Sequence, residues 1–211
     1  MLNISPAIIP HSLSELEEKM KIVADDTDWV HIDITDGAFA PGQTWNNPDD
    51  LELIPGRAKI EVHLMTEKPE ENITLWAQVA DRIIVHVEST DKLGVILNSF
   101  EHTVSKLGLA LLLDTPLTEI EEYLSLKHLS LIQLMSIKKI GHHGESFNEE
   151  VLAKITALKK MWPEGLIQVD GGINLDTAKE VKLAGARSLV VGSSLWQAQD
   201  FTTELNKFKN I

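Results

Sequence analysis

Residues 29–34 read Trp-Val-His-Ile-Asp-Ile, a short run in which ionisable side chains interrupt an otherwise apolar strand. Successive side chains of a strand point to opposite faces, so His31 and Asp33 share one face and the aliphatic residues share the other. A strand buried on both faces is expected to be apolar throughout. We therefore interpret one face of this strand as packing against helices and the other as carrying a functional site.

This run is one of a series of β-type segments that alternate with helical patterns along the whole chain. The segments cover residues 4–9, 29–34, 59–65, 82–88, 109–114, 129–136, 166–170 and 188–192. Each is followed by a polar turn and then by apolar residues at helical spacing, as in Val151, Ile155 and Leu158. Ser12 and Glu15 have the spacing of a capping box at the start of the first helix.

Eight strand-then-helix units within 211 residues predict an α/β protein with a (β/α)₈ TIM barrel, formed by residues 1–211 as a single domain. An open, doubly wound sheet would need fewer units or longer helices. The chain is 43% hydrophobic and 24% charged, which allows it to bury a large core.

Charge and cysteine content exclude several functions. The 19 basic and 32 acidic side chains give a net charge of −13, which repels nucleic acid and anionic membranes. The absence of cysteine removes disulfides, thiolate metal sites and cysteine nucleophiles, so a metal would need His and carboxylate ligands. Because the sequence shows neither a signal peptide nor a long apolar run, we expect a cytoplasmic protein.

Polar residues interrupt other strands in the same way. His63 and Met65 alternate with aliphatic residues in the third segment, His86 and Glu88 in the fourth, and Asp170 precedes a Gly-Gly pair in the seventh. These groups lie towards the carboxyl ends of their strands, where the βα loops of a TIM barrel build the active site. We therefore expect their side chains to converge at one mouth of the barrel.

Four of these residues form a candidate metal site: His31, Asp33, His63 and Asp170. Two imidazoles and two carboxylates suit Zn²⁺, Fe²⁺, Mn²⁺ or Co²⁺, and the sequence does not choose among these ions. Taken singly, each residue is better explained as a core polar group with satisfied hydrogen bonds. Several buried carboxylates at matching strand ends favour a shared cation instead, because it offsets the desolvation cost.

Separated motifs along the chain resemble those of a known family. They are HIDITDG at residues 31–37, VHLM at 62–65, VHVE at 85–88, VDGG at 169–172 and VGS at 191–193. In their order and spacing these motifs resemble the strand-end motifs of ribulose-phosphate 3-epimerases. The resemblance implies a homo-oligomeric TIM barrel that interconverts D-ribulose 5-phosphate and D-xylulose 5-phosphate, with one divalent metal ion bound by the matching His, Asp, His and Asp.

The resemblance also implies roles for individual residues. Asp33 and Asp170 would be the acid and base that move a proton at C3 through a metal-stabilised enediolate, and two opposed carboxylates suit that chemistry. Met65 and Met135 match methionines of the family's substrate pocket, although ordinary core packing explains them as well.

Phosphate binding is expected at glycine-rich turns, because the three arginines of the chain lie far apart in the sequence. The loops after strands seven and eight are the usual phosphate site of such barrels. The expected substrate contacts are Gly171, Gly172, Gly192 and Ser193 in these loops, together with Gly144 in the loop after strand six. The alternative interpretation is that the glycines only permit tight turns.

Several departures from the family pattern point to altered substrate recognition, among them a shortened loop after strand five at residues 113–116 and Gly42 in place of an asparagine. The loop at residues 137–145 differs from the family's Asn-Pro-Gly-Phe-Gly-Gly-Gln type, Ala7 replaces a serine, and Thr35 replaces a methionine. Other functions therefore stay open. The protein could be an epimerase of another ketose phosphate such as a hexulose 6-phosphate, a metal-dependent hydrolase or lyase, or a barrel that binds a phosphosugar or a protein without turnover.

Overall fold

The computed structural model describes residues 2–23, 26–54, 56, 58–141 and 144–211. Eight parallel strands close into a barrel in sequence order, so the fold prediction is confirmed. The strands are β1 (Asn3–Ile8), β2 (Trp29–Thr35), β3 (Lys59–Met65), β4 (Arg82–His86), β5 (Lys106–Leu111), β6 (Leu129–Met135), β7 (Ile167–Asp170) and β8 (Ser188–Val191). β1 pairs with both β2 and β8, which closes the ring.

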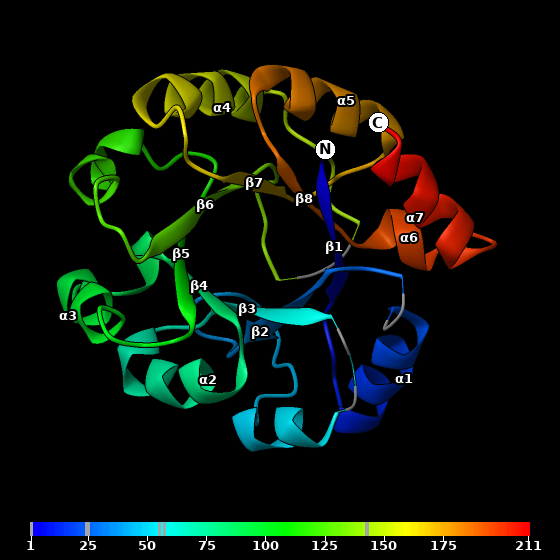
Figure 1. Cartoon of the computed structure of the whole chain (residues 1–211), viewed down its shortest axis with the longest axis horizontal. Helices are drawn as coiled ribbons and strands as arrows, with labels where there is room; N and C mark the ends of the chain where they lie inside the picture. Colours follow the sequence, from blue (N-terminus) through cyan, green and yellow to red (C-terminus); the bar gives the residue numbers. More distant parts are fainter. Residues whose placement is uncertain (1, 24–25, 55, 57, 142–143) are drawn as a thin grey trace.

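The helices lie around the outside of the ring of strands (Figure 1). They are α1 (Leu13–Val23), α2 (Ile73–Val79), α3 (Leu93–Ser99), α4 (Glu150–Met161), α5 (Leu175–Ala184), α6 (Ser193–Trp196) and α7 (Phe201–Lys209). The Ser12 hydroxyl accepts a hydrogen bond from the Glu15 N–H at 3.2 Å, as predicted for the start of α1, whereas the Glu15 carboxylate accepts from the N–H of His11 and not of Ser12.

The expectation of a helix after every strand is wrong at two places. Among the described residues, β2 is followed only by the 3₁₀ turn Pro48–Leu53, and β5 only by the 3₁₀ turns Leu117–Glu119 and Glu121–Tyr123. The segment after β2 holds Gly37 and Gly42, both at positive φ, which α-helices exclude. After β5, the apolar residues recur every third position, and that spacing fits a 3₁₀ helix, in which residues i and i+3 eclipse.

Strand boundaries differ from the predicted ones by up to three residues. β5 begins at Lys106 and ends at Leu111, where residues 109–114 were expected. β4 ends at His86, and Glu88 lies in the 3₁₀ turn Val87–Ser89 that follows. This turn moves Glu88 out of the ladder but keeps its side chain beside His86.

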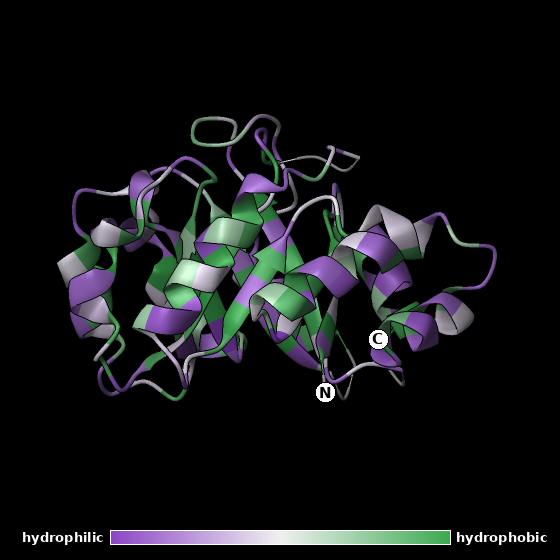
Figure 2. Ribbon diagram, turned by 90° about the horizontal axis from the view of Figure 1, so that it is seen from above, coloured by the Kyte–Doolittle hydropathy of each residue, from purple (hydrophilic) through white to green (hydrophobic). Residues whose placement is uncertain are grey.

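The main core lies between the strands and the surrounding helices. Aliphatic residues on the outward faces of the strands, such as Ile32 and Val62, pack against helix residues such as Leu16 and Phe208. Figure 2 shows this layering, with hydrophobic residues along the strands and hydrophilic ones on the outer helix surfaces. In the part of the chain that the structure describes, no helix has the length and apolar character needed to span a membrane.

The inside of the barrel has an apolar plug and a polar layer. Ile84, Ala110 and Leu131 form a small buried cluster, and a Cβ at Gly108 would lie 2.8 Å from the Leu131 side chain. Next to this plug lie buried polar residues of the interior, among them Glu61, Gln133 and Gln168, and these lead to the site at the carboxyl ends of the strands.

Candidate active site

Strand pairing brings the four predicted ligand residues together. Asp33 on β2 lies directly opposite His63 on β3, and β7 ends at Asp170. One ligand atom from each of His31, Asp33, His63 and Asp170 lies within 4.8 Å of the others. Both imidazoles are fully buried, while the Asp170 side chain is 14% exposed. The cluster thus lies at the floor of the mouth, where the sequence predicts it.

Asp33 is the centre of this cluster. Its Oδ1 lies 3.2 Å from Nε2 of His31 and 2.9 Å from Nδ1 of His63. Oδ2 of Asp170 lies 3.7 Å from the same His63 nitrogen and 4.0 Å from the same His31 nitrogen. Nε2 of His31 and Nδ1 of His63 therefore face the two carboxylates.

A buried network holds the other side of His31. Its Nδ1 lies 3.0 Å from Oε1 of Glu61, which also accepts a hydrogen bond from Gln168 at 2.8 Å. The second oxygen of Glu61 accepts from Arg82 at 2.7 Å, and the Arg82 guanidinium stacks 4.0 Å from the Trp29 ring. Because a carboxylate only accepts hydrogen bonds, Nδ1 of His31 carries a proton and Nε2 is the nitrogen that faces the cluster.

The electrostatics of the cluster give its two aspartates very different pKa values. Burial and the nearby charge of Asp33 raise the pKa of Asp170 to about 7. Burial acts in the same direction on the pKa of Asp33, but its interactions with His31 and His63 outweigh burial and hold the pKa far below the usual range. Asp33 is therefore ionised at neutral pH, while Asp170 is partly protonated.

The pKa values of the two imidazoles, His31 and His63, also differ widely. Burial lowers the pKa of His63 to about 4, so this ring is neutral at pH 7. Burial also disfavours the charged form of His31, but Asp33 and Glu61 outweigh it and raise the pKa of His31 well above its usual value. Burial opposes ionisation of Glu61 too, yet its bonds to His31 and Arg82 lower its pKa to about 2.

These observations fit a divalent metal ion. Burial and then the charge of Asp33 raise the pKa of Asp170, and a cation held between the two carboxylates would offset both effects. Two nitrogen and two oxygen donors from rigid strands are the ligand types that Zn²⁺ and the neighbouring divalent transition metals accept. The residues present are thus suited to hold one such ion.

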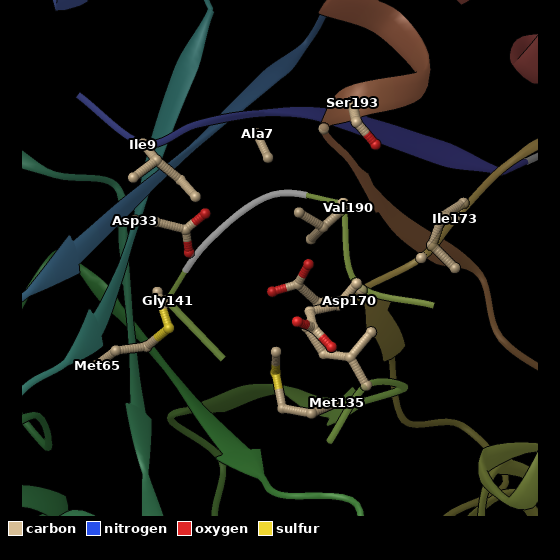
Figure 3. A pocket seen from close by; sticks show the side chains of 16 residues that line it. Ala7, Ile9, Asp33, Met65, Met135, Gly141, Asp170, Ile173, Val190 and Ser193 are labelled. Carbon is tan, nitrogen blue, oxygen red and sulfur yellow. The ribbon is translucent and has the colours of Figure 1, made fainter. Parts of the chain in front are cut away.

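An open pocket lies above the cluster and contains about 510 Å³ of space, its mouth included. In Figure 3 the carboxylates of Asp33 and Asp170 point towards one another, with Met65 and Met135 on one side and Ala7 on the opposite side. The pocket lining includes every residue expected to contact substrate: Met65, Met135, Gly144, Gly171, Gly172, Gly192 and Ser193.

Two glycines of this lining have both conformations and spacings that other residues do not tolerate. Gly172 has a φ of +64°, and a Cβ there would lie 2.5 Å from the backbone nitrogen of Phe147. Gly171 has a φ of +110°, and a Cβ there would lie 2.7 Å from the Ile137 side chain. No Lys or Arg side chain lines the pocket among the residues whose placement is described. Among the described residues, backbone N–H groups and the Ser193 hydroxyl are thus available partners for an anion at this end.

The sequence interpretation missed two residues of the site. Gln133 donates from Nε2 to Oδ2 of Asp170 at 3.2 Å and lies 3.3 Å from the His63 ring. It interrupts an apolar strand at the same parity as Met135, which is the signal that identified the aspartates. Glu145 also lines the pocket, in the loop that departs from the family pattern.

The fold and the site together define a TIM-barrel protein with a candidate mononuclear metal centre at the mouth of the barrel. The sequence profile of the Ribulose-phosphate 3 epimerase family matches residues 3–196. The chain is 35% identical to the ribulose-phosphate 3-epimerase of Synechocystis, over 98% of this chain and 93% of that protein. It is 34% identical to that of Bacillus subtilis, over 95% and 94%. The chain belongs to the ribulose-phosphate 3-epimerase family and is an isomerase.

Solved structures agree on the fold. KGPDC from Streptococcus mutans superposes with a TM-score of 0.73 at 15% identity, covering 100% of this chain and 97% of that one. The 3-hexulose-6-phosphate synthase of Salmonella typhimurium gives a TM-score of 0.70 at 18% identity, with coverage of 99% and 97%. At such identities these similarities show the TIM barrel alone.

Proposed function

We propose that the protein interconverts D-ribulose 5-phosphate and D-xylulose 5-phosphate by moving a proton at C3. The observation that carries the proposal is the opposed pair Asp33 and Asp170, which face one another across the pocket on the candidate metal cluster (Figure 3). Membership of the epimerase family supports the same reaction.

The two carboxyl groups have different proton affinities, which is what an acid and base pair requires. Asp33 is held ionised, and the pKa of Asp170 is raised by burial and by Asp33 to about 7. Both imidazole contacts of Asp33 use Oδ1, so Oδ2 is the oxygen positioned to take a proton. One aspartate removes the C3 proton, the other delivers a proton to the opposite face, and the roles exchange in the reverse direction.

We propose that His31, Asp33, His63 and Asp170 hold one divalent ion, of the group Zn²⁺, Fe²⁺, Mn²⁺ and Co²⁺. When bound, it supplies positive charge that stabilises the enediolate formed when C3 loses its proton. The protein contributes the orientation of the ligands, because Glu61 fixes the His31 ring and Gln133 holds the Asp170 carboxylate.

The pocket has one end for the reacting carbons and another for the phosphate. Met65 and Met135 lie beside the two aspartates and contribute apolar, non-ionisable contacts. At the other end, the glycine turns at Gly171 and Gly172 and the start of α6 at Ser193 leave room for a phosphate to approach the backbone. We assign the sugar phosphate to this orientation.

A second candidate substrate class is another ketose phosphate, such as a hexulose 6-phosphate. The pocket wall beside β1 is formed by the aliphatic residues Ala7, Ile9 and Val190, so it offers no side-chain hydrogen bond to a sugar hydroxyl. A ketose phosphate whose hydroxyls do not need a partner there fits this wall equally well.

The test is a coupled epimerase assay on ribulose 5-phosphate with protein stripped of metal and reloaded separately with each of the four ions. Asp33→Asn and Asp170→Asn are the active-site variants, and Asp176→Asn, on the exposed surface of α5, is the matched control. Since general acid and base catalysis contributes about 10²- to 10⁴-fold, each active-site variant should lose at least that much kcat, and the control none.

Solvent exchange at C3 identifies the step. In D₂O the wild-type protein should place deuterium at C3, and neither active-site variant should do so at a comparable rate. Activity on a hexulose 6-phosphate alone would move the assignment to the second substrate class. Ligand binding without exchange, with every ion and both sugars, would show a barrel that does not catalyse epimerisation.

A further inference from the structure

A series of side-chain contacts leads from the candidate metal ligands to a carboxylate outside that group. Nε2 of His63 lies 3.0 Å from Nε2 of His86, and Nδ1 of His86 lies 3.1 Å from Oε2 of Glu88. The other oxygen of Glu88 accepts a hydrogen bond from the N–H of Leu112 at 2.8 Å. Glu88 thus connects the end of β5 to a candidate metal ligand on β3, through one intervening imidazole.

The direction of every hydrogen bond in this series follows from its two ends. A neutral imidazole has one donor and one acceptor nitrogen. If Nδ1 of His63 offers its lone pair to a metal ion, Nε2 of His63 must carry the proton and donate to His86. Nε2 of His86 is then the acceptor, so Nδ1 of His86 carries its proton and donates to Glu88. A carboxylate is suited to this terminal position because it only accepts.

The surroundings hold these groups in place. The His86 ring is fully buried, stacks 5.0 Å from the His63 ring, and contacts the Phe39 ring at the same distance. The hydroxyl of Ser89 donates to the His86 carbonyl at 2.8 Å, which fixes the turn that carries Glu88. These contacts hold the series Glu88–His86–His63 in a fixed geometry, so the group at position 88 determines which nitrogen of each imidazole carries the proton.

We propose that Glu88 is a positioning residue that acts through His86 to fix the tautomer of His63 required for metal binding. This inference rests on the metal site of the proposed function. Glu61 holds His31 by direct contact, whereas Glu88 holds the second imidazole ligand at one remove. Carboxylates that orient metal-binding histidines typically contribute about 10- to 100-fold in affinity.

The decisive variant is Glu88→Gln, which keeps the shape and reverses the hydrogen bonds. The Leu112 N–H needs the amide oxygen as its acceptor, so the amide NH₂ faces Nδ1 of His86 and donates to it. His86 must then carry its proton on Nε2 and donate to His63, which places the His63 proton on the nitrogen that faces the metal. The expected result is Zn²⁺ affinity about 10- to 100-fold weaker than wild type.

Glu67→Gln is the matched control, since Glu67 has an exposed side chain in the neighbouring loop after β3. It should leave the affinity unchanged. Zn²⁺ affinity is measured by competition with a chelator, and thermal unfolding of the metal-free proteins shows whether each variant is folded. A purely structural role for Glu88 would lower the unfolding temperature without changing the affinity of the folded protein.

Nitrogen-15 NMR of the imidazoles in Zn²⁺-loaded wild type tests the proposal without a variant. His86 should carry its proton on Nδ1 and His63 on Nε2, and the opposite assignment would overturn the proposal even if Glu88→Gln does not fold. Equal Zn²⁺ affinity in wild type and folded Glu88→Gln would also overturn it and leave the metal site intact. Failure of the wild type to bind any of the four ions would refute the metal site itself.

Discussion

Metal binding should release protons, and the number released should depend on pH. In the metal-free protein, the pKa of Asp170 is raised by burial and by Asp33 to about 7, and the pKa of His31 is raised well above its usual value by its carboxylate neighbours. Both groups must lose their protons to become ligands. His63, with a pKa lowered by burial to about 4, and Asp33, with a pKa far below the usual range, are already deprotonated.

The magnitude follows from these groups. Below about pH 6, each bound ion displaces about two protons, so affinity rises about 100-fold per pH unit. Above the pKa of Asp170, which is about 7, only the proton of His31 remains to be displaced. Affinity then rises about tenfold per pH unit. The sign is the same throughout, because groups with raised pKa values hold protons that compete with the metal.

Calorimetric titration with Zn²⁺ in buffers of different ionisation enthalpy counts the protons directly. The Asp170→Asn variant should release about one proton fewer than wild type below about pH 6, and the exposed Asp176→Asn control should match wild type. If the number of protons released per bound Zn²⁺ stayed near zero both below about pH 6 and above about pH 7, the assignment of the raised pKa values to metal ligands would be refuted.

Two further predictions concern the turn between β7 and α5. Gly172→Ala should destabilise the protein by about 1–3 kcal/mol and raise KM, because residues other than glycine are strained at positive φ and the new Cβ displaces the backbone of Phe147. Gly94→Ala, in α3 with open space for its Cβ, is the control: it should leave KM unchanged and not destabilise the protein in urea unfolding, because alanine favours a helix. Asn174→Ala removes a capping box at the start of α5 and should cost about 1 kcal/mol in urea unfolding without changing metal affinity.

Much of the site could be read from the sequence because strand parity is a strong constraint. The inward positions of barrel strands are buried, so a polar residue there needs a hydrogen-bond partner or a ligand. At the carboxyl end of a strand such a residue lies at the mouth that forms the active site. That argument alone locates His31, Asp33, His63 and Asp170. The same argument applied to residues 129–135 would have located Gln133 as well, since it shares the parity of Met135.

Other features depended on partners that the sequence does not pair. Arg82 begins β4, and nothing local indicates that its guanidinium reaches Glu61 on the neighbouring strand. The link from Glu88 to the candidate metal ligands passes through His86, whose contact with His63 exists only because β3 and β4 are adjacent in the ring. The segments after β2 and β5 follow local turn geometry. The prediction of a helix in each segment relied instead on the regular strand–helix repeat.

The placement of the ligands along the chain has a consequence for biosynthesis. His31, Asp33 and His63 lie on two strands that pair in register early in the sequence, whereas Asp170 lies near the end of the barrel. Because chains are made from the amino terminus, three of the proposed ligands come together as soon as β2 and β3 pair. An ion captured by that pair would wait for β7, and Asp170 would complete its coordination only as the ring closes. Coordination of the proposed ion by all four residues would therefore require a closed barrel, whereas coordination by three of them would require only paired β2 and β3.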